Sequence, residues 1–137
     1  MVLGLAELSG EGLTSLLVDR VGKQRSIAIG LVVCCLAALA LPALSGSVWA
    51  AVGGLAVFYL GFEYALVSSI PLMTEVVPGA RATLMAVNVA AFSIGRGIGD
   101  LAAPPLYNHG ILACALAAIA VNLLALLALS QVKIKTE

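Results

Sequence analysis

The sequence predicts an all-α integral membrane protein, built as a bundle of about five transmembrane helices. Three observations support this prediction. First, 62% of the 137 residues are hydrophobic and only 10% are charged, whereas soluble globular chains are about half apolar and about a quarter charged. Second, the apolar residues form long runs with short interruptions. Third, six of the seven Lys and Arg residues fall in alternate connections between those runs or after the last run.

Five apolar segments approach the roughly 20 residues that a helix needs to cross a bilayer. They cover approximately residues 2–18, 27–44, 48–70, 82–103 and 111–129. The later segments are joined by short connections that carry turn-forming residues, at 45–47 (SGS), 77–80 (VPGA) and 104–110 (PPLYNHG). Runs of this length are too long for barrel strands, and no sustained alternation of apolar and polar residues occurs. Neighbouring segments are therefore expected to be antiparallel helices.

The basic residues predict which ends of these helices face the cytoplasm. Six of the seven lie between the first and second segments, between the third and fourth, and after the fifth, at Arg20, Lys23, Arg25, Arg81, Lys133 and Lys135. The connections at 45–47 and 104–110 contain no Lys or Arg. Alternation of five helices puts all the basic positions on one side. The positive-inside rule then predicts that this side, with the carboxyl terminus, is cytoplasmic.

Composition also argues against several classes of function. The formal net charge is zero, and no basic patch with interleaved aromatic residues indicates a nucleic-acid partner. The three cysteines, Cys34, Cys35 and Cys114, lie inside apolar runs and are expected to be packing residues. Because neither metal-ligand spacing nor a nucleophile–base pair is present, we expect no metal, no cofactor and no enzymatic activity.

Five charged residues fall inside the predicted spans, where charges are costly and usually functional. They are Glu7, Glu11, Glu63, Arg96 and Asp100. A rise of ~1.5 Å per residue places Glu11 and Glu63 roughly 10 Å from the cytoplasmic face, Glu7 roughly 17 Å and Arg96 roughly 21 Å. Glu7 and Arg96 are therefore level enough to pair if their helices touch. Asp100 follows Arg96 by one helical turn, so these two can also pair.

Two interpretations of the five charges remain open. In the first, one of the carboxylates takes up and releases a proton during transport of a substrate. In the second, the charges form internal ion pairs that fix the register of the helices. Glu7 and Glu11 are also compatible with a water-filled gap or with contact to a helix that the chain lacks.

The fourth segment carries a stripe of small residues. Ala91, Gly95, Gly99 and Ala103 repeat every four residues and therefore share one face of a helix. Such a stripe lets another membrane helix approach closely. We therefore predict a helix-packing surface there.

The stretch SLLVDRVGKQRS at 15–26 resembles the cytoplasmic loop signature of the major facilitator superfamily, D-R-x-G-R/K-x-R. Asp19, Arg20, Gly22, Lys23 and Arg25 fit the pattern, and Ser15 stands where the family usually has Gly. The resemblance implies that Asp19 interacts with a helix amino terminus across the bundle interface and that Gly22 forms the turn. It also implies that the three basic residues contact that helix end, acidic partners or anionic lipids. A simpler alternative is that Lys23 and Arg25 only anchor the topology.

If the resemblance holds, residues 1–137 are a partial six-helix carboxy-terminal half, similar to helices eight to twelve of a twelve-helix permease in a prokaryotic plasma membrane. The family's cavity-lining helices then favour Glu63 as the coupling residue. The implied function is alternating-access transport of a small solute, of the proton-coupled efflux type. The expected partners are the bilayer and either the missing amino-terminal half or another membrane chain. The alternative is a small non-transporting subunit that packs against a partner membrane protein.

Overall fold

The computed structural model describes residues 18, 20–76 and 78–132, and this part of the chain is helical without any strand. Four long helices follow one another: α2 (Lys23–Leu44), α3 (Val48–Val76), α4 (Arg81–Tyr107) and α5 (Ile111–Gln131). A short 3-10 helix, η1 (Pro78–Ala80), joins α3 to α4. All four long helices are long and apolar enough to cross a membrane. The prediction of an all-helical chain with several transmembrane helices is thus confirmed for these four.

The helices coincide with four of the five predicted spans. The predicted spans at 27–44, 48–70, 82–103 and 111–129 each lie within one observed helix, and every helix extends beyond its predicted span at one or both ends. The extensions at 23–26 and 130–131 are polar, whereas those at 71–76 and 104–107 are largely apolar. Of the fifth predicted span, 2–18, only Val18 lies in the described part of the chain.

The prediction of a connection at 104–110 is partly wrong. Helix α4 continues through Pro104 and Pro105 to Tyr107, and only 108–110 form the turn. The two prolines lack amide hydrogens, so they cannot donate to the carbonyl groups one turn earlier. They are nevertheless tolerated in the final turn, because the amides after them close it: Asn108 donates to Pro104 at 3.2 Å and Gly110 to Tyr107 at 2.9 Å.

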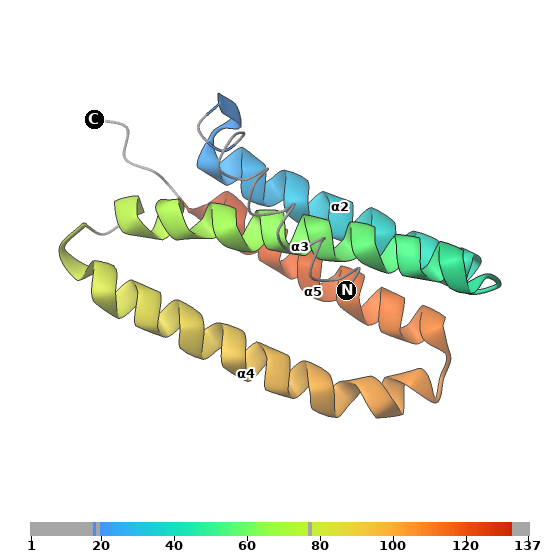
Figure 1. Cartoon of the computed structure of the whole chain (residues 1–137). Helices are drawn as coiled ribbons and strands as arrows, with labels where there is room; N and C mark the ends of the chain where they lie inside the picture. Colours follow the sequence, from blue (N-terminus) through green and yellow to red (C-terminus); the bar gives the residue numbers. More distant parts are fainter. Residues whose placement is uncertain (1–17, 19, 77, 133–137) are drawn as a thin grey trace.

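Figure 1 shows how the helices are arranged. Helices α2, α3 and α5 lie close together, and α2 packs against both of the others. Helix α4 lies apart from these three along most of its length and joins them at its two ends. A small cluster of Ile27, Ala65 and Leu72, covered by Leu31 and Leu129, forms the hydrophobic centre of the three-helix layer.

Close packing of α2 on α3 depends on small side chains. On α2, Ser26, Gly30, Cys34 and Ala38 are buried and repeat every four residues. Gly30 of this row meets Gly61 and Ala65 of α3, and a Cβ atom at Gly30 would lie only 2.6 Å from the Gly61 carbonyl oxygen. The two backbones therefore touch, as is typical of small-residue interfaces between membrane helices.

Many large apolar side chains lie on the surface. Leu36, Trp49, Ile98 and Leu101 are all more than 60% exposed. A surface of this kind would aggregate in water, whereas it needs no further cover in lipid. Together with the four apolar helices, it indicates a multi-pass membrane protein.

Substitution of Gly30 tests the α2–α3 contact. We expect Gly30→Ala to lower the unfolding free energy by about 1–3 kcal/mol, because the new methyl group would overlap the Gly61 carbonyl and Ala65. Gly53→Ala is the matched control, since a Cβ atom at Gly53 has open space around it. Thermal unfolding in detergent micelles measures both variants. Equal stability of the two would show that α2 and α3 do not meet at Gly30.

Two buried serines offer a second test of the same interface. Ser26 and Ser68 are both fully buried, but only the Ser68 hydroxyl, which donates to the Tyr64 carbonyl, has a hydrogen-bond partner among the described residues. An unsatisfied buried hydroxyl costs about 1–3 kcal/mol. We therefore expect Ser26→Ala to raise the unfolding temperature and Ser68→Ala to lower it. Calorimetry of the purified variants measures the two shifts, and a fall for Ser26→Ala would contradict the geometry.

Candidate functional site at the basic end of the bundle

Polar contacts gather four helix termini at one end of the molecule. The starts of α2 and α4 meet the ends of α3 and α5 there, through side chains of Lys23, Gln24, Glu75 and Arg81. We call this the basic end, defined by Arg20, Lys23, Arg25 and Arg81. The sequence predicts that these four residues share one side, and the contacts between the helix termini place them at one end.

A sharp turn at Gly22 leads the chain into α2. Gly22 has φ 92° and ψ 137°, a conformation that residues with a side chain rarely adopt. Its amide donates to the Val18 carbonyl at 3.0 Å, and its own carbonyl accepts from the Ser26 amide at 2.9 Å. Helical residues therefore lie on both sides of the turn. The role predicted for Gly22, to form this turn, agrees with the geometry.

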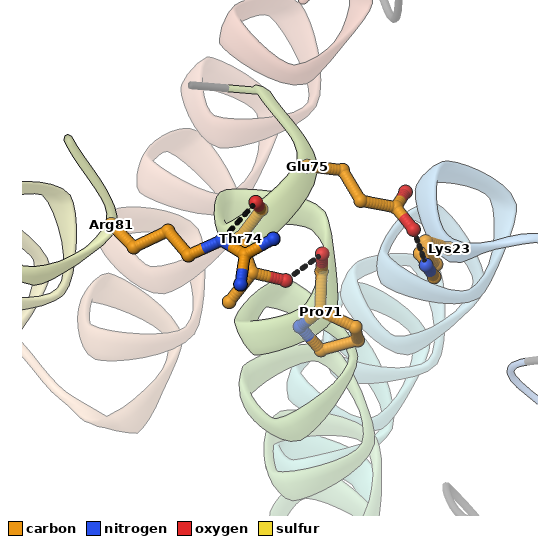
Figure 2. Close-up of polar contacts among 5 residues, drawn as sticks. All are labelled: Lys23, Pro71, Thr74, Glu75 and Arg81. Atoms are coloured by element: carbon orange, nitrogen blue, oxygen red, sulfur yellow. Dashed lines mark hydrogen bonds and ion pairs between the residues drawn. The ribbon is translucent and has the colours of Figure 1, made fainter. Parts of the chain in front are cut away.

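An ion pair between Lys23 and Glu75 joins the first residue of α2 to the last turn of α3 (Figure 2). The ammonium group donates a hydrogen bond to Oε1 of the carboxylate. The side chains are 24% and 48% exposed, so solvent screens their attraction. The pair therefore sets the position of the two helix ends more than it adds to their stability.

The end of α3 is completed by Thr74 and Arg81, as Figure 2 shows. The Thr74 hydroxyl donates to the Pro71 carbonyl at 2.8 Å, and the Arg81 Nε–H donates to the Thr74 carbonyl at 3.2 Å. The last carbonyl groups of a helix lack partners within it, and a cation near them is favourable. Arg81 thus ties the start of α4 to the end of α3 across η1.

Gln24 connects α2 to α5. Its side-chain amide donates to the Leu129 carbonyl at 2.8 Å and to the Val132 carbonyl at 3.3 Å, and so satisfies terminal carbonyl groups of α5. Sequence analysis missed this residue, because Gln24 occupies a variable position of the loop signature. Only the three-dimensional contact with α5 distinguishes it.

The other residues of the loop signature are either exposed or outside the described residues. Arg20 and Arg25 are exposed and take no part in an ion pair within the described part of the chain. Ser15 and Asp19 lie outside it. At this end the described residues therefore present two free guanidinium groups beside the engaged Lys23.

Of the charges predicted inside the spans, Glu63, Arg96 and Asp100 are described, whereas Glu7 and Glu11 are not. Glu63 is half-buried on α3 and engages in a polar interaction. Arg96 and Asp100 are exposed on α4, and among the described residues no ion pair joins them. The pairing that their spacing allows is thus not formed.

The stripe predicted on α4 is open. Ala91, Gly95, Gly99 and Ala103 are exposed, and a Cβ atom at either glycine would meet nothing within 4 Å. No described helix packs closely on it. The stripe that the fold does use, on α2, has the same four-residue spacing and includes only one glycine, Gly30.

Towards the opposite end, α2, α3 and α5 surround an apolar pocket of about 190 Å³. It is lined by Ala38, Leu41, Leu55, Phe58, Ile111, Cys114, Ala115 and Ala118. With no charged side chain in this lining, the pocket suits only apolar groups. Within the described ranges, no group of three or more His, Cys, Asp or Glu side chains is placed to hold a metal ion.

Three comparisons with known proteins found no match to this chain. No protein-family model matches the chain, and neither a curated protein nor a solved structure shows significant similarity to it. Functional conclusions therefore depend on the residues and contacts described above.

The ion pair at the basic end can be measured directly. We expect Lys23→Gln and Glu75→Gln to show a coupling free energy of about 0.2–1 kcal/mol in a double-mutant cycle, since the pair is partly exposed. Added salt should reduce this coupling. Unfolding in detergent provides the free energies. A parallel cycle of Arg25→Gln with Glu75→Gln serves as the control and should show no coupling, so equal values in both cycles would contradict the contact.

Proposed function

We propose that the chain is the carboxy-terminal part of a major facilitator transporter, which moves a small solute by alternating access. The observation that carries the proposal is the loop signature at 19–25 together with the place of its described residues. Gly22 forms a sharp turn directly before a membrane helix, and Lys23 bonds the end of α3. A loop that links the ends of several helices is well placed to respond when helix bundles rock against each other.

The distribution of basic residues supports a cytoplasmic location for the basic end. Arg20, Lys23, Arg25 and Arg81 gather there, whereas the opposite turns at 45–47 and 108–110 contain no Lys or Arg. The positive-inside rule favours a cytoplasmic basic end, and we place the protein in a prokaryotic plasma membrane because the loop signature resembles that of such transporters. The two free guanidinium groups would lie at the level of anionic headgroups.

Glu63 is the best candidate for a residue that couples transport to protons. It lies near the middle of α3, in a helix otherwise rich in apolar and aromatic side chains, and it is half-buried. Its carboxylate takes part in a polar interaction, which a change of protonation would alter. Because it is the one acidic residue between Val48 and Thr74, proton binding there would change the charge of this helix in the membrane.

The proposed mechanism requires further helices. Alternating access needs two bundles that enclose a central site, whereas three described helices form one layer and the fourth has no buried residue among those described. The partner is therefore the amino-terminal half of a longer transporter or a second membrane chain. The substrate is a small solute, and export in exchange for protons is the proposed direction.

Proton coupling by Glu63 can be tested in the full-length transporter. Everted vesicles energised with lactate report proton movement through the quenching of an acridine dye, and ethidium serves as the probe substrate. We expect ethidium to release the quenching in the parent protein. Glu63→Gln should reduce this release at least tenfold, because the amide cannot carry a proton, and Glu63→Asp should restore part of it.

Two outcomes would contradict the proposal in different ways. Unchanged proton movement in Glu63→Gln would remove this residue from the coupling mechanism while leaving transport intact. No response of the parent protein to ethidium or to a panel of sugars and cationic drugs would argue against transport itself.

The second candidate is a small membrane subunit that does not transport. The open face of α4 favours it, since small residues and two charges are exposed there without a helix packed on them. Such a subunit would copurify with a partner membrane protein in fixed stoichiometry and would leave the dye signal unchanged. Transport by the full-length form would exclude this alternative.

A further inference from the structure

Two exposed aromatic side chains lie at the end of the molecule opposite the basic end. Trp49 belongs to the first turn of α3 and is 86% exposed, and Tyr107 ends α4 and is 67% exposed. Figure 1 shows the turns next to them, at 45–47 and 108–110, at this same end. Within the described part of the chain, neither ring contacts another aromatic ring. Aromatic packing inside the chain therefore does not explain where these two rings lie.

Each ring lies where the surface changes from polar to apolar. The turn at 45–47 contains two serines, and the turn at 108–110 contains an asparagine and a histidine, all of them exposed. Further along the same helices, towards the middle of the molecule, the exposed side chains include Leu55 and Leu101. An amphipathic ring between a polar turn and an apolar span is the arrangement that the membrane interface favours.

Spacing along the two helices gives an independent measure. Twenty-six residues separate Trp49 from Glu75 in α3, and the same number separates Arg81 from Tyr107 in α4. At ~1.5 Å per residue, each separation is about 39 Å. The two counts start level, because the Arg81 Nε–H donates to the carbonyl of Thr74, the neighbour of Glu75. Both rings therefore lie at the same distance from the basic end.

This distance matches the thickness of a bilayer with its headgroups. The hydrocarbon core is about 30 Å thick, and the bilayer with its headgroup regions is about 40–45 Å thick. Helices α2 and α5, with 22 and 21 residues, contain no aromatic residue and are each about 32 Å long, which suits the core alone. Only α3 and α4, with 29 and 27 residues, extend well beyond the core. Each of these two longer helices has an aromatic ring at the end away from the charges.

We propose that Trp49 and Tyr107 insert into the headgroup region of the bilayer at the end opposite the basic end. The apolar body of each ring lies against the upper part of the acyl chains, and the indole N–H or phenol O–H reaches water and the ester carbonyl groups. The partner of this surface is thus the lipid headgroup layer itself. The proposal does not depend on transport, because it concerns only how the helices sit in the membrane.

The two insertions matter most for α4. No residue of this helix is buried among those described, so side-by-side packing constrains its depth little. Where packing is sparse, interfacial Trp, Tyr, Lys and Arg residues set how a helix sits in the bilayer. Arg81 at one end of α4 and Tyr107 at the other therefore hold the helix at a fixed depth.

Fluorescence of Trp49 tests the placement without a label, because it is the one tryptophan of the chain. The whole chain is reconstituted in phosphatidylcholine vesicles that contain lipids brominated either near the glycerol backbone or near the chain ends. We expect the bromines near the glycerol to quench the emission about twice as strongly. Equal or stronger quenching by the chain-end bromines would place the ring in the core and overturn the proposal. Absence of quenching by either lipid would place the ring in water or under protein, and would also overturn it.

A tryptophan moved to the bilayer centre is the matched control. Val121 is 66% exposed and lies ten residues from each end of α5. In Trp49→Phe combined with Val121→Trp, the chain-end bromines should quench more strongly. The same order of quenching as in the parent protein would show that positions 49 and 121 share one depth, and would contradict the proposal.

The same reporter can be moved to α4. Trp49→Phe combined with Tyr107→Trp should reproduce the quenching order of the parent protein, because positions 49 and 107 lie equally far from the basic end. Stronger quenching by the chain-end bromines, or none by either lipid, would refute the insertion of α4.

Discussion

Backbone contact between Gly30 and Gly61 is the constraint on which the rest of this structure depends. A Cβ atom at Gly30 would lie 2.6 Å from the Gly61 carbonyl. This close contact fixes the register of α2 against α3. Their register then brings Lys23 beside Glu75 and leaves Ser26 and Ser68 fully buried. In a membrane the hydrophobic effect does not drive helices together, because lipid tails are as apolar as the side chains. Van der Waals contacts of this kind therefore hold the helices together. The ion pair at the basic end therefore follows from packing that occurs deeper in the bundle.

Contacts at the basic end extend this register to the other two helices. Gln24 lies in the first turn of α2, so its hydrogen bonds to the end of α5 fix the axial position of α5 relative to α2. Arg81 reaches the last turn of α3 and fixes where α4 begins. Three helices thus form a layer with both side-by-side packing and terminal hydrogen bonds. Helix α4 has ties mainly at its ends and one aromatic contact, Phe62 on Phe92, between them. The molecule is therefore firmly packed in one part and open in another.

Sequence patterns predict the helices better than they predict the contacts. Hydropathy alone locates four described spans, since lipid requires long apolar helices whatever their neighbours. The distribution of Lys and Arg predicts that the basic residues share an end, and Gly22 is recognisable as a turn.

Which helices pack on each other is harder to predict from the sequence. Two four-residue stripes exist, and the one with two glycines, on α4, is open, whereas α3 packs on the stripe with Ser26, Gly30 and Cys34. A stripe shows that a helix can approach, but not which helix does. The extension of α4 through Pro104 and the role of Gln24 likewise depend on contacts that are distant in sequence.

The unequal coverage of the helices has an electrostatic consequence. In the three-helix layer the central small residues are buried, terminal carbonyl groups are bonded at Leu129 and Thr74, and Lys23 is paired. Helix α4 carries Arg96 and Asp100 at depths where unpaired charges are costly, and both are exposed. Neither residue helps α4 to pack on α3 or α5, so folding stability alone does not explain their presence. Charged groups inside a membrane usually pair with one another or with backbone carbonyls, or face a water-filled cavity. Among the described residues, α4 is therefore the helix that carries charges at membrane depth without packing against its neighbours along most of its length.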